Sequence, residues 1–192
     1  MRERIGVAHG RFQPLHLGHL EYLLAAKALC RLLLVGITNP DPSQITQEPA
    51  EPRRSAPSSN PCTYYERYVM VERALVRSGV RRAELRVVPF PHSYPERLRY
   101  YLPADPLLLL TVYDQWSEVK ASRFEALGLR TRVLWRRDQK VTSGSAIRER
   151  IARGQPWEHL VPVSTAAVIH EFGIEQRIRE LLALVGTAEE RP

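Results

Sequence analysis

The strongest constraint on the fold of this chain is a regular alternation of short apolar segments with longer amphipathic ones. Five short segments have the composition and length of buried strands. They are residues 4–8, 32–37, 84–89, 107–112 and 130–135. Between and after them, apolar residues recur with a helical period. The helices predicted from this pattern are 17–29, 63–78, 115–127, 144–153 and 164–184, the last with a break near Gly173.

This alternation predicts an α/β fold, because strands separated by helices of this length are joined by crossovers into a parallel sheet. We expect a doubly wound, Rossmann-like sheet of about five strands, followed by a helical C-terminal region at about 143–185. The 192 residues, 44% of them hydrophobic, suit a single domain spanning 1–192. Ligands bind such sheets at the carboxyl ends of the strands, where the strand order reverses. Functional residues are therefore expected directly after the first strand.

The segment at about 39–61 interrupts the pattern. It contains six prolines among polar residues and has neither helical nor strand periodicity. Loops of this length are typical of lids or linkers, and the position of this one between a strand and a helix of the same domain favours a lid. Arg53 and Arg54 lie in it. Two hypotheses stay open: one of these arginines closes over bound phosphates, or both are solvated surface charges.

The charge of the chain indicates an anionic partner. Lys and Arg number 28 against 21 Asp and Glu, which gives a formal net charge of +7. Only three of the 28 are lysines. Arginine binds phosphate bidentately, although a compositional bias of the source genome would also enrich it. No aromatic-and-basic face or nucleic-acid-binding motif accompanies the charge, so no nucleic-acid partner is expected.

Location is predicted from what the sequence does not contain. No apolar run approaches the roughly 20 residues of a membrane-spanning helix, so no membrane association is expected. The N-terminus does not have the pattern of a secretion signal. Cys30 and Cys62 fit neither a disulfide framework nor a zinc spacing. These features predict a cytoplasmic protein.

The most informative motif, GRFQPLHLGH, runs from Gly10 to His19 and follows the first expected strand. His16 and His19 are three residues apart at a helix start, so their rings lie on one face and can hold the same phosphate. Gly10 permits a ligand to approach the backbone, Gly18 is expected to leave space between the rings, and the helix N-terminus adds partial positive charge. A zinc site would need a third ligand, which the pattern does not provide. The motif predicts a phosphate site.

A second motif, SGSAIR, occupies residues 143–148. Ser143 and Ser145 are natural helix N-caps, and Arg148 lies one turn into the helix, where it would meet an anion at the N-terminus. Taken alone, the motif describes an ordinary capped surface helix. Together with the first motif it predicts the second half of a triphosphate cradle. Three basic residues after the last strand are further candidates for phosphate contact at the same edge: Arg136, Arg137 and Lys140.

These motifs resemble the nucleotidylyltransferase superfamily marked by His-x-Gly-His, and within it the archaeal-type nicotinamide mononucleotide adenylyltransferases. Residues 10–19 match that family's Gly-Arg-Phe-Gln-Pro-x-His-x-Gly-His, and residues 60–67 are similar to its Asn-Pro-Phe-Thr-x-x-Glu-Arg. Residues 143–148 are similar to its Ser-x-Thr-x-Ile-Arg, and residues 154–162 also follow its pattern. The matching segments keep the family's order over nearly the whole chain.

The resemblance implies an enzyme that transfers a nucleoside monophosphate from a nucleoside triphosphate to a phosphate or phosphonate oxygen of a small acceptor, with release of pyrophosphate. It implies that four catalytic residues contact the phosphates: Arg11, His16, His19 and Arg148. Mg²⁺ would accompany the triphosphate, held by phosphate and water rather than by protein side chains. The nucleotide-binding residues that the resemblance implies are Gly10, Arg11, Phe12, Gly18, Ser143, Gly144, Ser145 and Ile147.

The acceptor pocket is where this sequence departs from the adenylyltransferases. They carry Thr-Gly-Asn after the fourth strand, whereas residues 111–116 here read TVYDQW. In the leading interpretation ATP is the donor and nicotinamide or nicotinate mononucleotide the acceptor, with Tyr113, Asp114 and Trp116 as candidate pocket residues. In the alternative the chain resembles the cytidylyltransferases of phosphonate natural-product pathways, which couple CTP to a small phosphonate such as phosphonoformate. The sequence does not separate the two. Relatives often assemble, so a homo-oligomer is also left open.

Overall fold

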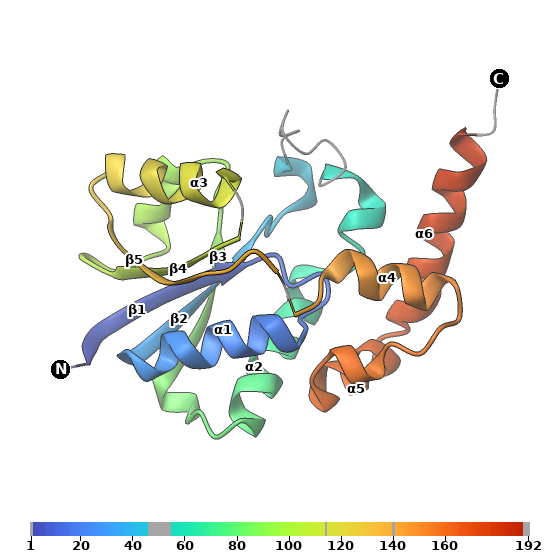
Figure 1. Ribbon diagram of the computed structural model, residues 1–192, viewed down its shortest axis with the longest axis horizontal. Coiled ribbons are helices and arrows are strands. Elements are labelled where there is room, and N and C mark those ends of the chain that lie inside the picture. The colour runs from blue at the N-terminus through green and yellow to red at the C-terminus, as the bar shows by residue number, and fades with distance from the viewer. Residues whose placement is uncertain (1, 46–54, 114, 140, 190–192) are drawn as a thin grey trace.

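The computed structural model describes residues 2–45, 55–113, 115–139 and 141–189. Its centre is a five-stranded sheet in the order β3-β2-β1-β4-β5, and every neighbouring pair of strands is parallel (Figure 1). The strands are β1 (Glu3–Gly10), β2 (Cys30–Thr38), β3 (Leu85–Phe90), β4 (Leu107–Val112) and β5 (Arg130–Arg136). The strand order reverses between β1 and β4. The expected α/β class and Rossmann-like sheet are therefore confirmed.

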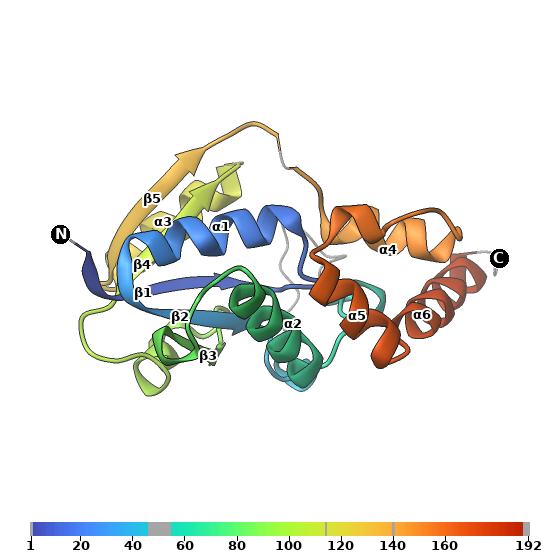
Figure 2. The same cartoon turned by 90° about the horizontal axis from the view of Figure 1, so that it is seen from below.

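Helices cover both faces of the sheet, as expected for a doubly wound fold. They are α1 (Leu17–Ala28), α2 (Tyr64–Arg77), α3 (Gln115–Ala126), α4 (Gly144–Ala152), α5 (Val163–Glu171) and α6 (Ile174–Glu189). α1 and α2 pack on one face and α3 on the other, while α4, α5 and α6 lie beyond the carboxyl ends of the strands (Figures 1 and 2). The predicted break near Gly173 separates α5 from α6, and this glycine has a φ of 61°.

β1 is buried on both faces, which explains its continuous apolar sequence. Successive side chains of a strand point to opposite faces. Val7 therefore packs with Phe124 on the α3 side of the sheet, whereas Ala8 packs with Leu23 on the α1 side. Side chains on either face of this strand are buried, so an apolar sequence suits residues 5–8, and the buried His9 ring that follows stacks on Phe90.

The two central strands separate towards their carboxyl ends. β1 pairs with β4 at Gly6 and Val7, whereas its pairing with β2 continues to Gly10. Beyond Val7 the Tyr22 hydroxyl of α1 lies between the strands: it accepts from the His9 backbone N–H at 3.1 Å and donates to the Leu109 carbonyl at 2.5 Å. Burial raises the pKa of Tyr22 well above its usual range, so the hydroxyl keeps its proton. The sheet is thereby opened at the edge where a ligand is expected.

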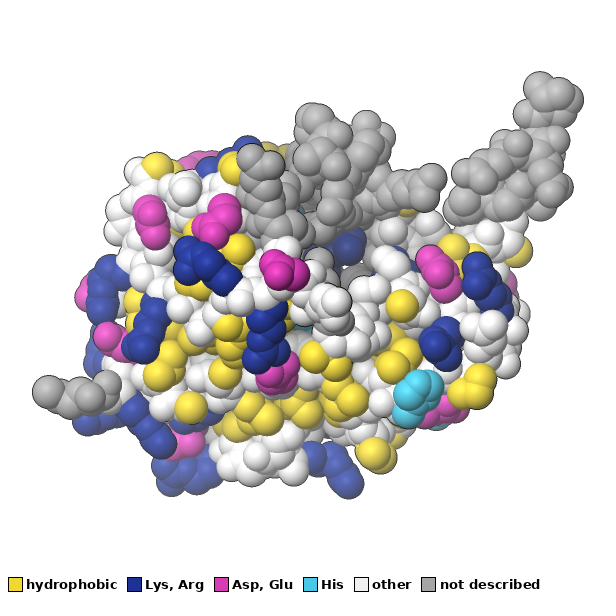
Figure 3. Space-filling model, viewed as in Figure 1, with side chains coloured by type: hydrophobic (Ala, Val, Ile, Leu, Met, Phe, Trp, Pro, Cys, Tyr) yellow, Lys and Arg dark blue, Asp and Glu magenta, His cyan; other side chains and the backbone are white. Residues whose placement is uncertain are grey.

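Hydrophobic side chains also reach the surface across α1 (Figure 3). Leu17, at the start of this helix, is 38% exposed. α1 thus carries apolar residues on its outer as well as its inner face. Among the described residues, no helix is long and apolar enough to cross a membrane.

Candidate active site

The two sequence motifs meet at the carboxyl end of β1. The Arg148 guanidinium of α4 donates to the Gln13 carbonyl at 2.6 Å and to the Ser145 hydroxyl at 3.3 Å. The Gln13 side chain pairs in turn with the backbone of Cys62, donating to its carbonyl at 2.9 Å and accepting from its N–H at 2.8 Å. Gln13 therefore holds together the first motif, the start of α4 and the segment that leads into α2.

His16 and His19 form a stacked pair at the N-terminus of α1. Their ring centroids are 3.6 Å apart and the ring planes differ by 19°. His16 is the N-cap residue, and its Nδ1 accepts from the His19 backbone N–H at 3.2 Å. Since Nδ1 acts as the acceptor, a neutral His16 ring carries its proton on Nε2 and can donate it to an anion. The helix N-terminus adds partial positive charge at the same place.

The expected role of Gly18, leaving space between the rings, is wrong. The two rings already contact each other, and a Cβ on Gly18 would lie 3.4 Å from the His16 ring, which is ordinary van der Waals contact. Gly18 borders the pair instead of separating it. The hydrogen bond to His16 Nδ1 and the helical spacing place the rings, and neither needs a glycine at this position.

Gly10 has a packing role that the sequence analysis did not predict, while the expected close approach of a ligand to its backbone stays a prediction. A Cβ at Gly10 would lie 2.9 Å from the ring of Phe12, which is fully buried and has a φ of 52°. The same ring meets His19 edge-on at 5.0 Å. The buried Phe12 ring therefore packs against the His19 ring and helps to fix its position. The side chain of Ile147 is fully buried as well, so neither Phe12 nor Ile147 presents its side chain to a nucleotide.

Arg148 is buried and not a surface residue. It is 5% exposed, and desolvation lowers its pKa. In the described part of the chain it forms no ion pair with a carboxylate, so its charge is held only by a carbonyl and a hydroxyl. A buried cation of this kind is stabilised further when an anion binds nearby.

Gly144 brings α4 close enough for this contact. A Cβ at Gly144 would lie 2.6 Å from the Gln13 carbonyl oxygen, too close for backbone to accommodate. We expect Gly144→Ala to push α4 from the first motif, destabilise the protein by roughly 1–3 kcal/mol and lower turnover by roughly tenfold or more. Thermal melts and pyrophosphate release measure both effects. Gly18→Ala, whose Cβ has normal clearance, should melt like the wild type, and equal melting of both variants would contradict the assigned contact.

Arg67 is the residue of this edge that the sequence analysis did not single out. It is 2% exposed and donates to the backbone carbonyls of Thr63 at 3.1 Å, Arg11 at 3.1 Å, Thr38 at 2.7 Å and Asn39 at 2.9 Å. Burial lowers the pKa of Arg67 to about 10, so it remains charged at neutral pH. One guanidinium therefore joins the ends of β1 and β2 to the start of α2. The sequence did point to Arg67 in one way, because it ends the segment 60–67 that is similar to the family pattern. That similarity gave no indication of what Arg67 does.

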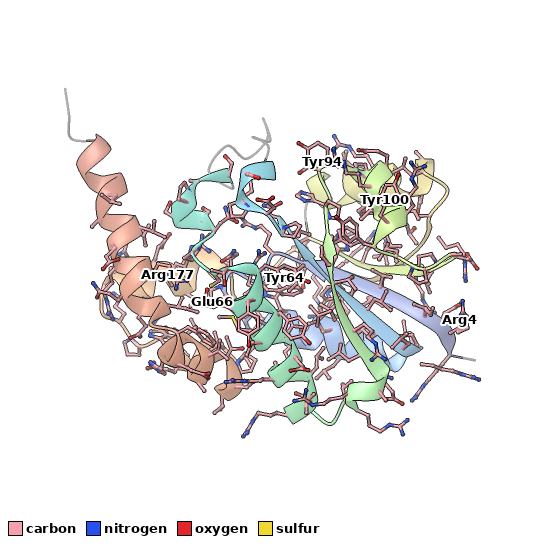
Figure 4. All side chains as sticks on the ribbon, turned by 180° about the vertical axis from the view of Figure 1, so that it is seen from behind. Arg4, Tyr64, Glu66, Tyr94, Tyr100 and Arg177 are labelled. Carbon is pink, nitrogen blue, oxygen red and sulfur yellow. The ribbon has the colours of Figure 1, made fainter. Side chains whose placement is uncertain are left out.

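Glu66 fixes the start of α2 and links it to α6. Its carboxylate accepts from the Thr63 backbone N–H at 2.7 Å, and the Thr63 hydroxyl accepts from the Glu66 N–H at 3.2 Å, forming a capping box. Arg177 of α6 donates to the same carboxylate at 2.7 Å and to the Pro61 carbonyl at 3.0 Å. Glu66 and Arg177 point towards each other in Figure 4. The C-terminal helix thus secures the segment that Gln13 holds from the other side.

Residues at the carboxyl ends of β4 and β5 form a small aromatic and charged cluster. The Trp135 indole N–H donates to the Tyr113 hydroxyl at 3.1 Å, and the Arg137 guanidinium lies 4.4 Å from the Trp135 ring centroid. Arg137 also pairs with Glu21 of α1 at 2.8 Å. Tyr113, a predicted pocket residue, is therefore accompanied by Trp135, which the sequence analysis assigned only to a strand.

Several predicted contacts are placed differently or not at all. Arg136 and Arg137 each pair with a carboxylate, Glu118 and Glu21 respectively, so they are not bare cations aimed at phosphate. The remaining predictions concern residues or side chains outside the described part of the chain. These are Arg53, Arg54, Asp114, Lys140 and the side chain of Trp116.

The groups that gather at this edge are of the kinds that bind anions. Within the described ranges, no three His, Cys, Asp or Glu side chains come together as a metal-binding group. Imidazoles, guanidiniums and a helix N-terminus are what a chain of phosphates requires. The parallel sheet, the stacked histidines and the buried arginine at its reversal point form the arrangement that the resemblance to the nucleotidylyltransferases leads us to expect.

The chain belongs to the cytidylyltransferase-like family, whose model matches residues 7–150. It is 62% identical over 174 residues to a phosphonoformate cytidylyltransferase of Streptomyces viridochromogenes, covering 91% of this chain and 95% of that protein. It is 28% identical over 185 residues to a nicotinamide-nucleotide adenylyltransferase of Pyrococcus furiosus, covering 96% and 92%. A bifunctional NMN adenylyltransferase/ADP ribose pyrophosphatase from Francisella tularensis has the same fold, with a TM-score of 0.68 over 98% of this chain and 54% of that chain at 16% identity.

Both enzyme types considered from the sequence are thus among the relatives. The cytidylyltransferase is more than twice as identical to this chain as the Pyrococcus adenylyltransferase. The comparisons therefore favour the alternative interpretation over the leading one, while the nucleotidyltransferase activity itself is common to both.

Proposed function

We propose that this enzyme transfers CMP from CTP to a phosphonate oxygen of phosphonoformate and releases pyrophosphate. The observation that carries the proposal is the 62% identity to a phosphonoformate cytidylyltransferase over 91% of the chain. Identity at that level extends far beyond the short phosphate motifs, which the adenylyltransferases also have. It therefore supports a shared acceptor as well as a shared reaction.

The chemistry needs positioning and charge stabilisation and no general base. The acceptor oxygen is already anionic; it forms a bond to the α-phosphorus while the bond to the bridging oxygen breaks, and pyrophosphate leaves with that electron pair. The barrier comes from bringing two anions together and from charge on the transferring phosphate. His16 and His19 donate hydrogen bonds to phosphate oxygens, and Arg11 and Arg148 offset the charge on the departing pyrophosphate.

Enzymes of this kind generally use a divalent metal, and we propose Mg²⁺ that enters with the triphosphate. Bound Mg²⁺ would neutralise part of the phosphate charge. The described side chains at the edge are mostly cations or neutral donors, which fits a metal held by phosphate oxygens and water. The chain's own task is then to orient the phosphates through the stacked histidines and the helix N-terminus.

A pyrophosphate-release screen tests the proposal by crossing CTP and ATP with phosphonoformate and nicotinamide mononucleotide. We expect CTP with phosphonoformate to exceed every other pair by roughly a hundredfold or more, because a wrong base or acceptor leaves polar groups of the site unpaired. Preference for ATP with nicotinamide mononucleotide would overturn the proposed substrates. If no pair released pyrophosphate, the transfer reaction itself would be contradicted.

A further inference from the structure

A second basic cluster lies at the opposite end of the sheet from the histidine pair. Five arginines and one glutamate line a pocket of about 590 Å³ at the amino ends of β1, β2 and β3. They are Arg2, Arg4, Arg31, Arg81, Arg86 and Glu84. Figure 4 shows Arg4 at the far end of the sheet from Glu66 and Arg177, and Figure 3 shows Lys and Arg side chains gathered at the end where the chain begins. The pocket volume is in the range of small-molecule sites, roughly 300–1,000 Å³.

The charge of this arginine pocket is not balanced by the residues that line it. Arg2, Arg4 and Arg31 form no ion pair with any residue that the structure describes. Arg86 donates only to backbone carbonyls, at 2.7 and 3.2 Å. Five arginines less one glutamate leave a formal charge of +4 around the pocket.

The one acid of the lining is already engaged. Glu84 forms a salt bridge with Arg81 and lies 3.4 Å from the Lys27 ammonium. These cations hold the pKa of Glu84 below its usual value, the hydrogen bond from Arg81 being the largest cause. Neighbouring guanidiniums repel one another, and a bound anion would relieve that repulsion.

The shape and lining of the pocket point to a small ligand. Ile5 and Leu32 contribute apolar surface to the pocket, and no histidine, serine, cysteine or aromatic side chain is among its lining residues. Surfaces that bind single-stranded nucleic acid combine positive charge with aromatic rings on which bases stack, and this lining has no such ring. Nor does it have a nucleophile or an acid–base pair, so it is suited to binding and not to catalysis.

We propose that the arginine pocket is a second anion site that binds a small molecule with two or more linked phosphate groups. Several guanidiniums around one concave surface match the geometry of a polyphosphate, because each can donate two parallel hydrogen bonds to phosphate oxygens. The polyphosphate is either an inorganic ion or the phosphate chain of a nucleotide. The pocket shares no residue with the histidine pair and does not depend on which substrates the enzyme uses.

Isothermal titration of the full chain with inorganic tripolyphosphate at low ionic strength tests this site. We expect two binding events in the wild type, one at each end of the sheet. The double variant Arg4→Gln/Arg31→Gln removes two exposed guanidiniums and should weaken one event by roughly tenfold or more, leaving the other unchanged. Arg123→Gln/Arg132→Gln is the matched control, since it removes the same charge from two exposed arginines outside the pocket and should keep both events.

Hydrogen exchange in the same samples locates each event. Tripolyphosphate should protect amides at 2–5, 30–32 and 84–86 in the wild type and in the control, and not in Arg4→Gln/Arg31→Gln. Parallel titrations with CTP separate the two sources: protection by CTP at these amides supports a nucleotide, and protection by tripolyphosphate alone supports an inorganic ion. A single binding event located at residues 10–19, unchanged binding in Arg4→Gln/Arg31→Gln, or tighter binding of a single-stranded oligonucleotide at the pocket amides would overturn the proposal. A single event located at the pocket amides would instead contradict the proposed active site.

Discussion

Replacing His19 with alanine is expected to lower kcat by roughly 10²- to 10³-fold, the cost of removing one donor aimed at charge that develops in the transition state. The ring of His19 stacks on that of His16 and is supported by Phe12, so its position is set before any ligand binds. The side chain is not part of a helix cap. Its loss should therefore leave the melting temperature close to that of the wild type, while steady-state pyrophosphate release falls.

His16 needs a different substitution because it has two roles. Its Nδ1 caps α1 by accepting from the His19 N–H, so His16→Ala would cost about 1 kcal/mol of stability together with activity. Asparagine is a strong N-cap residue but has no imidazole donor. We expect His16→Asn to keep the stability of α1 and still lose roughly 10²-fold or more in kcat.

The control for both variants is His159→Ala, which removes an exposed imidazole from the turn between α4 and α5, outside both phosphate motifs. It should retain normal turnover and stability. Near-normal rates for His19→Ala and His16→Asn would show that the histidine pair only packs the start of α1. Equal losses of rate and of stability in His19→Ala would point to the same conclusion.

Much of the fold could be predicted because each strand and helix has a recognisable local pattern of apolar and polar residues. A strand buried on both faces must be continuously apolar, so β1 and β4 stand out from their surroundings. Their parallel arrangement followed from the length of the helices between them, and the site at the end of β1 followed from the fold class. The ends were less well predicted: β1 continues to Gly10 because its pairing with β2 extends further than its apolar core.

The candidate site was predicted less completely, because several of its contacts join segments that are distant in sequence. The role of Arg67 depends on its hydrogen bonds to the carbonyls of Arg11, Thr38 and Asn39. These acceptors are far from Arg67 in sequence, so no local motif reveals them. Arg137 has the right position for a phosphate ligand, yet it pairs with Glu21 of another element. The packing role of Gly10 was missed for the same reason, since the ring beside it belongs to Phe12, whose backbone has a positive φ.

Arg67 and Arg148 give this edge its electrostatic character. Both residues are at most 5% exposed, and within the described part of the chain neither pairs with a carboxylate. Desolvation lowers the pKa of each, which means that burial disfavours their charged forms. Arg67 makes four bonds to backbone carbonyls, of which those of Arg11, Thr38 and Asn39 lie at or just beyond the ends of β1 and β2. The hydrogen bonds of the Arg67 guanidinium to these carbonyls offset the cost of burying its charge. The same charge adds to the positive potential that a triphosphate would meet.

Replacing Arg67 with methionine is expected to have the second largest effect. Methionine keeps the apolar stem but leaves buried carbonyls unsatisfied, each at a cost of roughly 1–3 kcal/mol before relaxation. We expect the variant to lose roughly 3–5 kcal/mol of stability and to melt roughly 6–20 °C lower. Turnover should fall by roughly 10²-fold at temperatures where the variant is folded, because the backbone of Arg11 is no longer held against β2.

Two further variants separate these bonds from general effects of charge. Arg73→Met removes an arginine from the same helix, but Arg73 is exposed and pairs only with Glu171 on the surface, so a change within about 1 kcal/mol is expected. Arg67→Lys keeps the charge but cannot reach carbonyls on three segments at once, so it should recover little activity. If Arg67→Lys had the kcat and melting temperature of the wild type, a positive charge alone would suffice. That result would contradict the positioning role assigned to the guanidinium. If Arg67→Met melted as the wild type does, the four carbonyl bonds would contribute nothing to the fold.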